Sequence, residues 1–168
     1  MAHLERLIER ESTFNTGERL SYLPYKDLSH LFYGISEGLE NQIKGDKEKK
    51  RVQLVFSGEE TVVETKEIAG IMVRMGQKNE EKIERINKND LNFELGEKAS
   101  YLRYDNLENF LLGIEKGMED QNEDYMVEKN EEMADLGTKA IEKIKKSTDI
   151  IDEMWRISEP YMKDKDKL

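Results

Sequence analysis

Four tyrosines have the residue type and spacing expected of a recognition surface. Two segments of the chain each read Ser-Tyr-Leu-x-Tyr, and a tyrosine combines a large apolar ring with a hydroxyl group that suits protein interfaces. These tyrosines are Tyr22, Tyr25, Tyr101 and Tyr104. The sequence predicts loops over 12–24 and 91–103, with these tyrosines within them or directly after them, and it predicts that the tyrosines contact a partner protein. The alternative is that their rings close the ends of a helical bundle.

Four glycines are spaced for close contact between helices. They form two pairs, each one helical turn apart: Gly34, Gly38, Gly113 and Gly117. A glycine inside a helix costs about 1 kcal/mol relative to alanine, so a repeated pair calls for a compensating gain. We expect this gain to be backbone contact at a helix crossing. The alternative is a groove in which a ligand or peptide touches bare helix backbone.

Residues for catalysis are scarce. The only histidines are His3 and His30, and the chain has no cysteine. It contains no Glu-x-x-His, no phosphate-binding Gly-Lys-Ser/Thr loop and no His-Glu-x-x-His. The sequence therefore predicts a protein that is not an enzyme, with no catalytic residue, no metal site and no cofactor. An enzyme that uses carboxylates or a divalent metal ion is the second alternative.

Charge is distributed unevenly along the chain. The formal net charge is −10, which disfavours direct binding to nucleic acid because such binding relies on Lys and Arg. Residues 44–51 hold five basic and two acidic residues, whereas residues 119–135 hold eight acidic residues and one lysine. The two segments could pair between chains, or each could be a solvated helix face. The acidic balance also leaves open a basic partner, or a decoy that mimics nucleic acid and inhibits a nucleic-acid-binding protein.

An internal repeat sets the expected architecture. The segment Phe14–Gln42 aligns without a gap on Phe93–Gln121, and 13 of the 29 aligned positions are identical. We therefore expect two equivalent modules. Repeat one covers 1–89 and repeat two covers 90–160, and 161–168 is expected to be a disordered tail. A residue that occurs in one copy only is not expected to belong to the shared scaffold.

Each module is predicted to hold a loop, a shorter helix and a long helix, and repeat one is predicted to open with an additional N-terminal helix. Residues 51–63 alone could form a strand, because Val52, Leu54 and Phe56 alternate with polar residues. Their counterparts in the second copy have no such alternation and favour helix. The sequence therefore predicts long, coiled-coil-like helices over about 46–88 and about 124–158, and an all-α bundle.

Composition agrees with this fold class and limits the function. Charged residues make up 38% of the chain and there are two prolines, which suits long amphipathic helices. No stretch is apolar enough to span a membrane, so a soluble cytoplasmic protein is expected. The predicted function is a non-enzymatic protein-interaction module (a scaffold, adaptor or inhibitor) that forms a homodimer and binds a protein partner.

Overall fold

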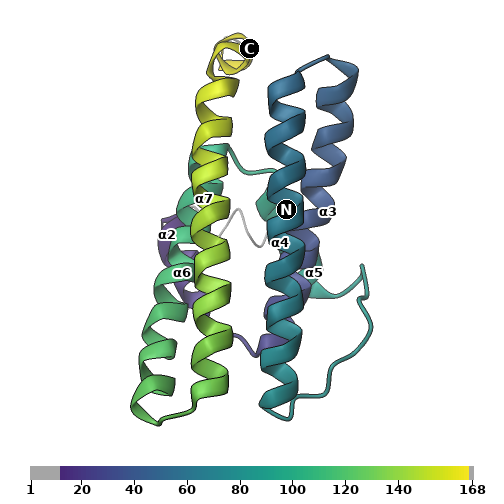
Figure 1. Ribbon diagram of the computed structural model, residues 1–168. Coiled ribbons are helices and arrows are strands. Elements are labelled where there is room, and N and C mark those ends of the chain that lie inside the picture. The colour runs from purple at the N-terminus through teal and green to yellow at the C-terminus, as the bar shows by residue number, and fades with distance from the viewer. Residues whose placement is uncertain (1–11, 167–168) are drawn as a thin grey trace.

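The computed structural model describes the backbone of residues 12–166 and the side chains of residues 12–159. This part of the chain forms helices and contains no strand, so the predicted all-α bundle is confirmed for it (Figure 1). The helices are α2 (Thr13–Leu20), α3 (Tyr25–Glu48), α4 (Val52–Lys78), α5 (Leu91–Ser100), α6 (Tyr104–Val127) and α7 (Glu131–Asp166). None of these helices combines the length and apolarity needed to cross a bilayer.

Two antiparallel helical hairpins form the body of the bundle. Helices α3 and α4 pack along each other and are joined by residues 49–51, while α6 and α7 are joined by residues 128–130. The two turns lie at opposite ends of the bundle, and α4 and α7 pack side by side between them (Figure 1). The hairpins therefore run in opposite directions along a common long axis.

The two hairpin turns share one backbone conformation. Lys50 and Lys129 both adopt a left-handed conformation, with φ of 57° and 59°. At the first turn, the Lys50 N–H donates to the Lys47 carbonyl at 3.1 Å and the Arg51 N–H donates to the Asp46 carbonyl at 2.9 Å. These bonds satisfy carbonyl groups that a helix end would otherwise leave unpaired. Each turn can therefore reverse the chain within three residues.

The short helices cross from one half of the chain to the other. Helix α2, which precedes the first hairpin, packs on α6 of the second hairpin. Helix α5, which precedes the second hairpin, packs on α3 of the first. Together with the α4–α7 contact, this exchange joins both hairpins into one bundle.

A single large cluster of buried side chains runs through both hairpins. On α3 and α6 the buried residues recur every three or four positions, which places them on one face of each helix. The matching sets are Leu28, Leu31, Phe32, Ile35 and Leu39 on α3, and Leu107, Phe110, Leu111, Ile114 and Met118 on α6. Burying a side chain of this kind stabilises the fold by roughly 1.5–3 kcal/mol.

Residues 51–63 lie almost entirely within α4, so the helical interpretation of this ambiguous segment is correct. The repeat outweighed the local alternation here, because the outer residues of the pattern face solvent while Leu54 packs inward. The alternating apolar residues therefore lie on two sides of one helix, some in solvent and one in the core, and they do not pair as a strand.

Several predicted helix boundaries are wrong. The segments 12–24 and 91–103 were expected to be loops, but most of each is helical, as α2 and α5. Ser12 and Asp90 explain this, since their side chains accept backbone N–H groups of the first turn and so begin the two helices.

The long helices also start later than expected. Helix α3 continues to Glu48 and α6 to Val127, so α4 and α7 begin at Val52 and Glu131. Helix α4 ends at Lys78 because Glu80 adopts a left-handed conformation, and residues 81–87 are not helical. The repeat boundaries remain predictions: residues 1–11 lie outside the described part, and the backbone of α7 is helical to Asp166.

Candidate functional site

The paired glycines lie where the exchanged helices meet. A methyl group added at Gly34 would overlap the carbonyl oxygen of Phe93 on α5, and one added at Gly113 would overlap that of Phe14 on α2. Both contacts are with backbone atoms of the facing helix. At these positions α3 touches α5, and α6 touches α2, with no side chain between them.

The second glycine of each pair faces a serine. A methyl group at Gly38 would lie 2.7 Å from Cβ of Ser100, and one at Gly117 would lie 2.7 Å from Cβ of Ser21. The side-chain amides of the following turn then bind the end of the short helix. Gln42 donates to the Ser100 carbonyl at 2.7 Å, and Gln121 donates to the Ser21 carbonyl at 2.9 Å. The two crossings thus have the same contacts at equivalent positions of the two copies.

Four further glycines take part in helix contacts that the sequence analysis did not assign. Gly17 and Gly96 lie on α2 and α5, where a methyl group would overlap the carbonyl oxygens of Phe110 and Leu31. Gly58 faces Ile43 within the first hairpin, and Gly137 faces Asn122 within the second. In both pairs the two glycines occupy aligned positions of the two copies, so the repeat itself was the signal that could have found them.

The four tyrosines fall into two classes. Tyr22 and Tyr101, which lie just beyond the ends of α2 and α5, are 57% and 52% exposed. Tyr25 is buried and Tyr104 is partly buried against the core. The sequence pattern therefore gives one exposed and one inward-facing ring in each copy, at the two junctions between a short helix and a hairpin.

The hydroxyl group of Tyr25 is engaged inside the protein. It lies 2.5 Å from the hydroxyl of Tyr125 on α6. Burial, followed by this hydrogen bond, raises the pKa of Tyr25. Glu81 accepts the backbone N–H groups of Tyr25 and Lys26 at 3.3 and 2.9 Å, and so caps the start of α3. A shallow hollow here is lined by Tyr22, Tyr25, Glu81 and Tyr125 among others.

Different partners surround the equivalent Tyr104. Burial, and then the negative charge of Asp46, raises the pKa of Tyr104 to about 12, while the charge of Arg51 acts in the opposite direction. The neighbouring Arg103 stacks over the ring of Trp155, with its guanidinium carbon 5.1 Å from the ring centroid. Because Arg103 aligns with Pro24, this contact belongs to the second copy alone.

His30 is placed within the scaffold, while His3 lies outside the described residues. His30 is 8% exposed on α3, and its Nδ1 lies 3.3 Å from Oδ1 of Asp90. Asp90 also accepts the N–H groups of Asn92 and Phe93 at the start of α5. This histidine therefore faces a helix cap. Within the described residues no three His, Asp or Glu side chains are grouped so that they could hold a metal ion.

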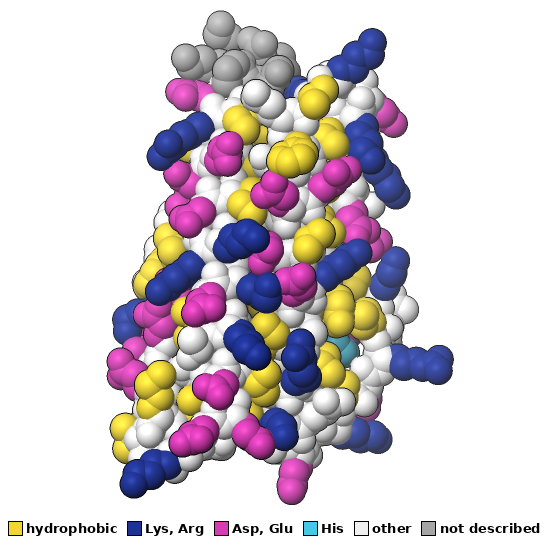
Figure 2. All heavy atoms as spheres, viewed as in Figure 1, with side chains coloured by type: hydrophobic (Ala, Val, Ile, Leu, Met, Phe, Trp, Pro, Cys, Tyr) yellow, Lys and Arg dark blue, Asp and Glu magenta, His cyan; other side chains and the backbone are white. Residues whose placement is uncertain are grey.

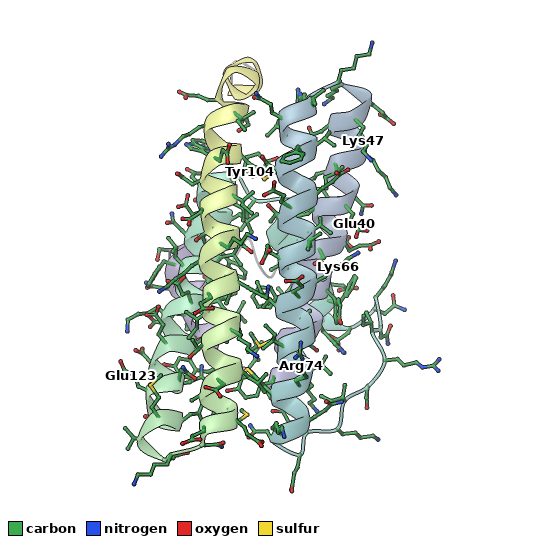
Figure 3. The ribbon with its side chains drawn as sticks, viewed as in Figure 1. Glu40, Lys47, Lys66, Arg74, Tyr104 and Glu123 are labelled. Atoms are coloured by element: carbon green, nitrogen blue, oxygen red, sulfur yellow. The ribbon has the colours of Figure 1, made fainter. Side chains whose placement is uncertain are left out.

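The two charged segments lie at opposite ends of the bundle. Residues 44–51 surround the turn between α3 and α4, and residues 119–135 surround the turn between α6 and α7. Figure 3 shows Lys47 near the first end and Glu123 near the second. The segments cannot meet within one chain, so any pairing between them would be between chains.

Ion pairs close the seam between α4 and α7. Glu64 on α4 is buried and lies 3.0 Å from Lys146 and 3.6 Å from Lys143 on α7. Lys143 also binds Glu67, and this hydrogen bond is the main cause that raises the pKa of Lys143. Lys78 and Glu132 pair at 2.7 Å further along the same seam. The α4–α7 contact is therefore occupied within the chain.

The outer face of α4 exposes large apolar side chains between charged ones. Val52, Phe56 and Val63 are 74%, 66% and 53% exposed, and they recur at helical spacing. No atom outside the local helix backbone lies within 4 Å of the position that a methyl group at Gly70 would take. Figure 2 shows apolar side chains between charged ones along this face, with α4 toward the viewer. We name Val52, Phe56, Val63, Gly70 and Val73 the α4 outer face.

Comparison with known proteins adds no relative. No protein-family model matches the chain, and neither the curated proteins nor the solved structures contain a significant match to it.

Proposed function

We propose that the chain is a non-enzymatic helical interaction module that self-associates, built from two diverged copies of one helical unit. The α4 outer face is the observation that carries this proposal. Three large apolar side chains in one row on a helix are more than the scattered exposure that needs no explanation. Self-association would remove them from water.

The paired crossings support the proposed duplication. Gly34 with Phe93 and Gly113 with Phe14 are the same contact made twice, with the two copies exchanging roles. The glutamine bonds at the ends of α5 and α2 repeat in the same way. In a duplicated unit, the short helix of each copy can cover the glycine-containing surface of the other copy, so that neither surface is exposed. On this reasoning the glycines belong to the scaffold, and function lies where the copies differ.

The alternative functions receive less support. A decoy for a basic protein needs an uninterrupted row of carboxylates, but ion pairs interrupt the acidic surface. Examples are Lys66 with Glu40 at 2.5 Å, Lys78 with Glu132 and Lys145 with Glu119. An enzyme that uses carboxylates or a divalent metal ion has no specific observation in its favour. The exposed Tyr22 and Tyr101 remain candidates for binding a further protein.

The mass of the protein in solution tests the proposal. We expect sedimentation equilibrium from about 1 to about 200 µM to give a mass approaching twice 19.7 kDa. The association should persist at about 0.5 M salt, because screening weakens exposed ion pairs and leaves apolar contacts in place. A chain that stays monomeric over this range would refute self-association.

A further inference from the structure

The α4 outer face differs sharply from its counterpart in the second copy. The residues that occupy the aligned positions on α7 are all acidic: Glu131, Asp135, Glu142, Asp149 and Asp152. The first four are exposed and Asp152 is half-buried, so the two faces have similar access to solvent. One copy thus has a solvated acidic face where the other has valine, phenylalanine and glycine. The shared scaffold does not require the apolar residues.

Gly70 leaves room on the α4 outer face for a side chain from another molecule, because no atom lies within 4 Å of a methyl group placed there. A glycine in mid-helix destabilises the helix, and each glycine at a crossing within the chain has a packing reason. Gly70 has none in the single chain, because the space beside it is open. A bulky side chain from outside could fill that space.

The face is self-complementary in one orientation. Phe56 lies seven residues before Val63, and Gly70 lies seven residues after it. In an antiparallel pair of α4 helices centred on Val63, Phe56 of each copy therefore lies over Gly70 of the other. Val52, eleven residues before Val63, then lies level with Arg74 of the other copy and next to its Val73. A twofold axis requires this reciprocity, in which residue i meets residue j and residue j meets residue i.

The charges on the same face follow the same symmetry. Glu59 and Lys66 lie four residues before and three residues after Val63, on the same side of α4. Each is about half exposed, although Glu59 lies 3.4 Å from Lys47 and Lys66 pairs with Glu40 in the chain. Figure 3 shows Lys66 and Glu40 on adjacent helices in the middle of the bundle. In the antiparallel pair Glu59 of one copy approaches Lys66 of the other, twice.

We infer that the partner on the α4 outer face is a second copy of this chain, bound through α4 in antiparallel orientation with the twofold axis at Val63. The inference rests on the proposed self-association and specifies its surface and orientation. The interface closes as a dimer, because a twofold axis pairs the same surface of both copies. The apolar side chains at this interface distinguish it from end-to-end pairing, which would join the basic hairpin turn of one chain to the acidic hairpin turn of another.

Cysteine cross-linking tests the orientation cleanly, because the native chain has no cysteine. Val63→Cys should form a covalent dimer on oxidation, since the two thiols lie at the axis. Val52→Cys alone should not, because its two copies would be about 33 Å apart along the helices. A mixture of Val52→Cys and Val73→Cys should form a mixed dimer. Glu142→Cys, at the matching position on α7, is the control and should stay uncoupled.

A charge exchange provides an independent readout. Glu59→Lys and Lys66→Glu should each weaken the dimer about tenfold through like-charge contacts. The double variant should restore affinity to near that of the native chain. Thermal melting of each variant at a concentration below the dimer dissociation constant shows that the monomer has folded.

The possible failures can be told apart. A chain that stays monomeric refutes the proposed function as well as this interface. A dimer in which Val52→Cys couples to itself as readily as Val63→Cys refutes the antiparallel orientation. Coupling of Glu142→Cys at the same rate as Val63→Cys refutes the choice of face. Coupling confined to a mixture of Lys49→Cys and Glu128→Cys would show end-to-end assembly in its place.

Discussion

Replacing Gly34 by alanine tests whether the exchanged helices depend on backbone contact. The added methyl group would overlap the carbonyl oxygen of Phe93 and lie 2.9 Å from the backbone nitrogen of Glu97. Cβ atoms in proteins essentially never approach other atoms within 3.0 Å. Both obstacles are backbone atoms of α5, so no side chain can rotate to make room. Helices α3 and α5 would have to move apart.

The expected loss follows from two opposing effects. Overpacking a tight site costs about 1–3 kcal/mol, and the upper end applies where the obstacle is backbone. Alanine returns about 1 kcal/mol through its higher helix propensity. The net effect of Gly34→Ala is therefore a destabilisation of about 2 kcal/mol. Gly113→Ala should lose a similar amount, because its methyl group would overlap the Phe14 carbonyl and lie 2.8 Å from Glu18 N.

Gly45 in the same helix is the matched control. No atom lies within 4 Å of a methyl group placed there, so Gly45→Ala should gain up to about 1 kcal/mol. The two variants should differ by about 3 kcal/mol, which corresponds to melting temperatures about 6–12 °C apart for a chain of this size. Urea denaturation followed by circular dichroism gives the free energies of unfolding. Equal stability of Gly34→Ala and Gly45→Ala would mean that α3 and α5 are not in backbone contact.

Two further predictions concern a turn and a carboxyl group. Lys50→Gly should stabilise the protein by about 1 kcal/mol in urea denaturation, because Lys50 has a φ of 57° that glycine adopts without strain. Lys49→Gly is the control and should not stabilise the protein, because Lys49 has a φ of −88°. Burial, and then the charge of Asp152, raises the pKa of Glu108. The protonated carboxyl group therefore stabilises the folded state at low pH. This stabilisation is lost as the pH rises through the raised pKa. Glu108→Gln should therefore raise the free energy of unfolding by about 0.5 kcal/mol at pH 7 after solvent screening, with no gain at pH 4. A gain for Glu108→Gln of the same size at both pH values would contradict this.

The helical fold could be predicted from the sequence because the repeat averages out local ambiguity. Residues 51–63 resemble a strand in one copy, but the same positions in the other copy hold good helix formers. The helix boundaries were missed for a local reason. Ser12 and Asp90 begin helices with side-chain caps, and Lys50, Glu80 and Lys129 end them in a left-handed conformation without glycine. Because these residues are common and polar, their types alone do not mark a helix end.

The exchange of short helices could not be predicted from the sequence. The spacing of Gly34 and Gly38, one helical turn apart, indicates a crossing but does not identify the helix that crosses. The answer depends on contacts between residues far apart in the chain, such as Gln42 with the Ser100 carbonyl. The tyrosine motif was similarly ambiguous, because the spacing of Tyr22 and Tyr25 does not show which of the two rings is buried.

The repeat also separates scaffold from function at the level of single residues. Glycines at positions 17, 34, 38 and 58 recur at the aligned positions of the second copy, and each of them packs against a neighbouring helix. Gly45 and Gly70 have no such counterpart, since Asp124 and Asp149 take their places, and a methyl group at either glycine would have no neighbour within 4 Å. Under the proposed duplication, a residue that differs between the modules at an exposed position is not required by the shared fold. Val63 and Glu142 differ in this way, and the proposed α4 dimer would bury the apolar member of the pair.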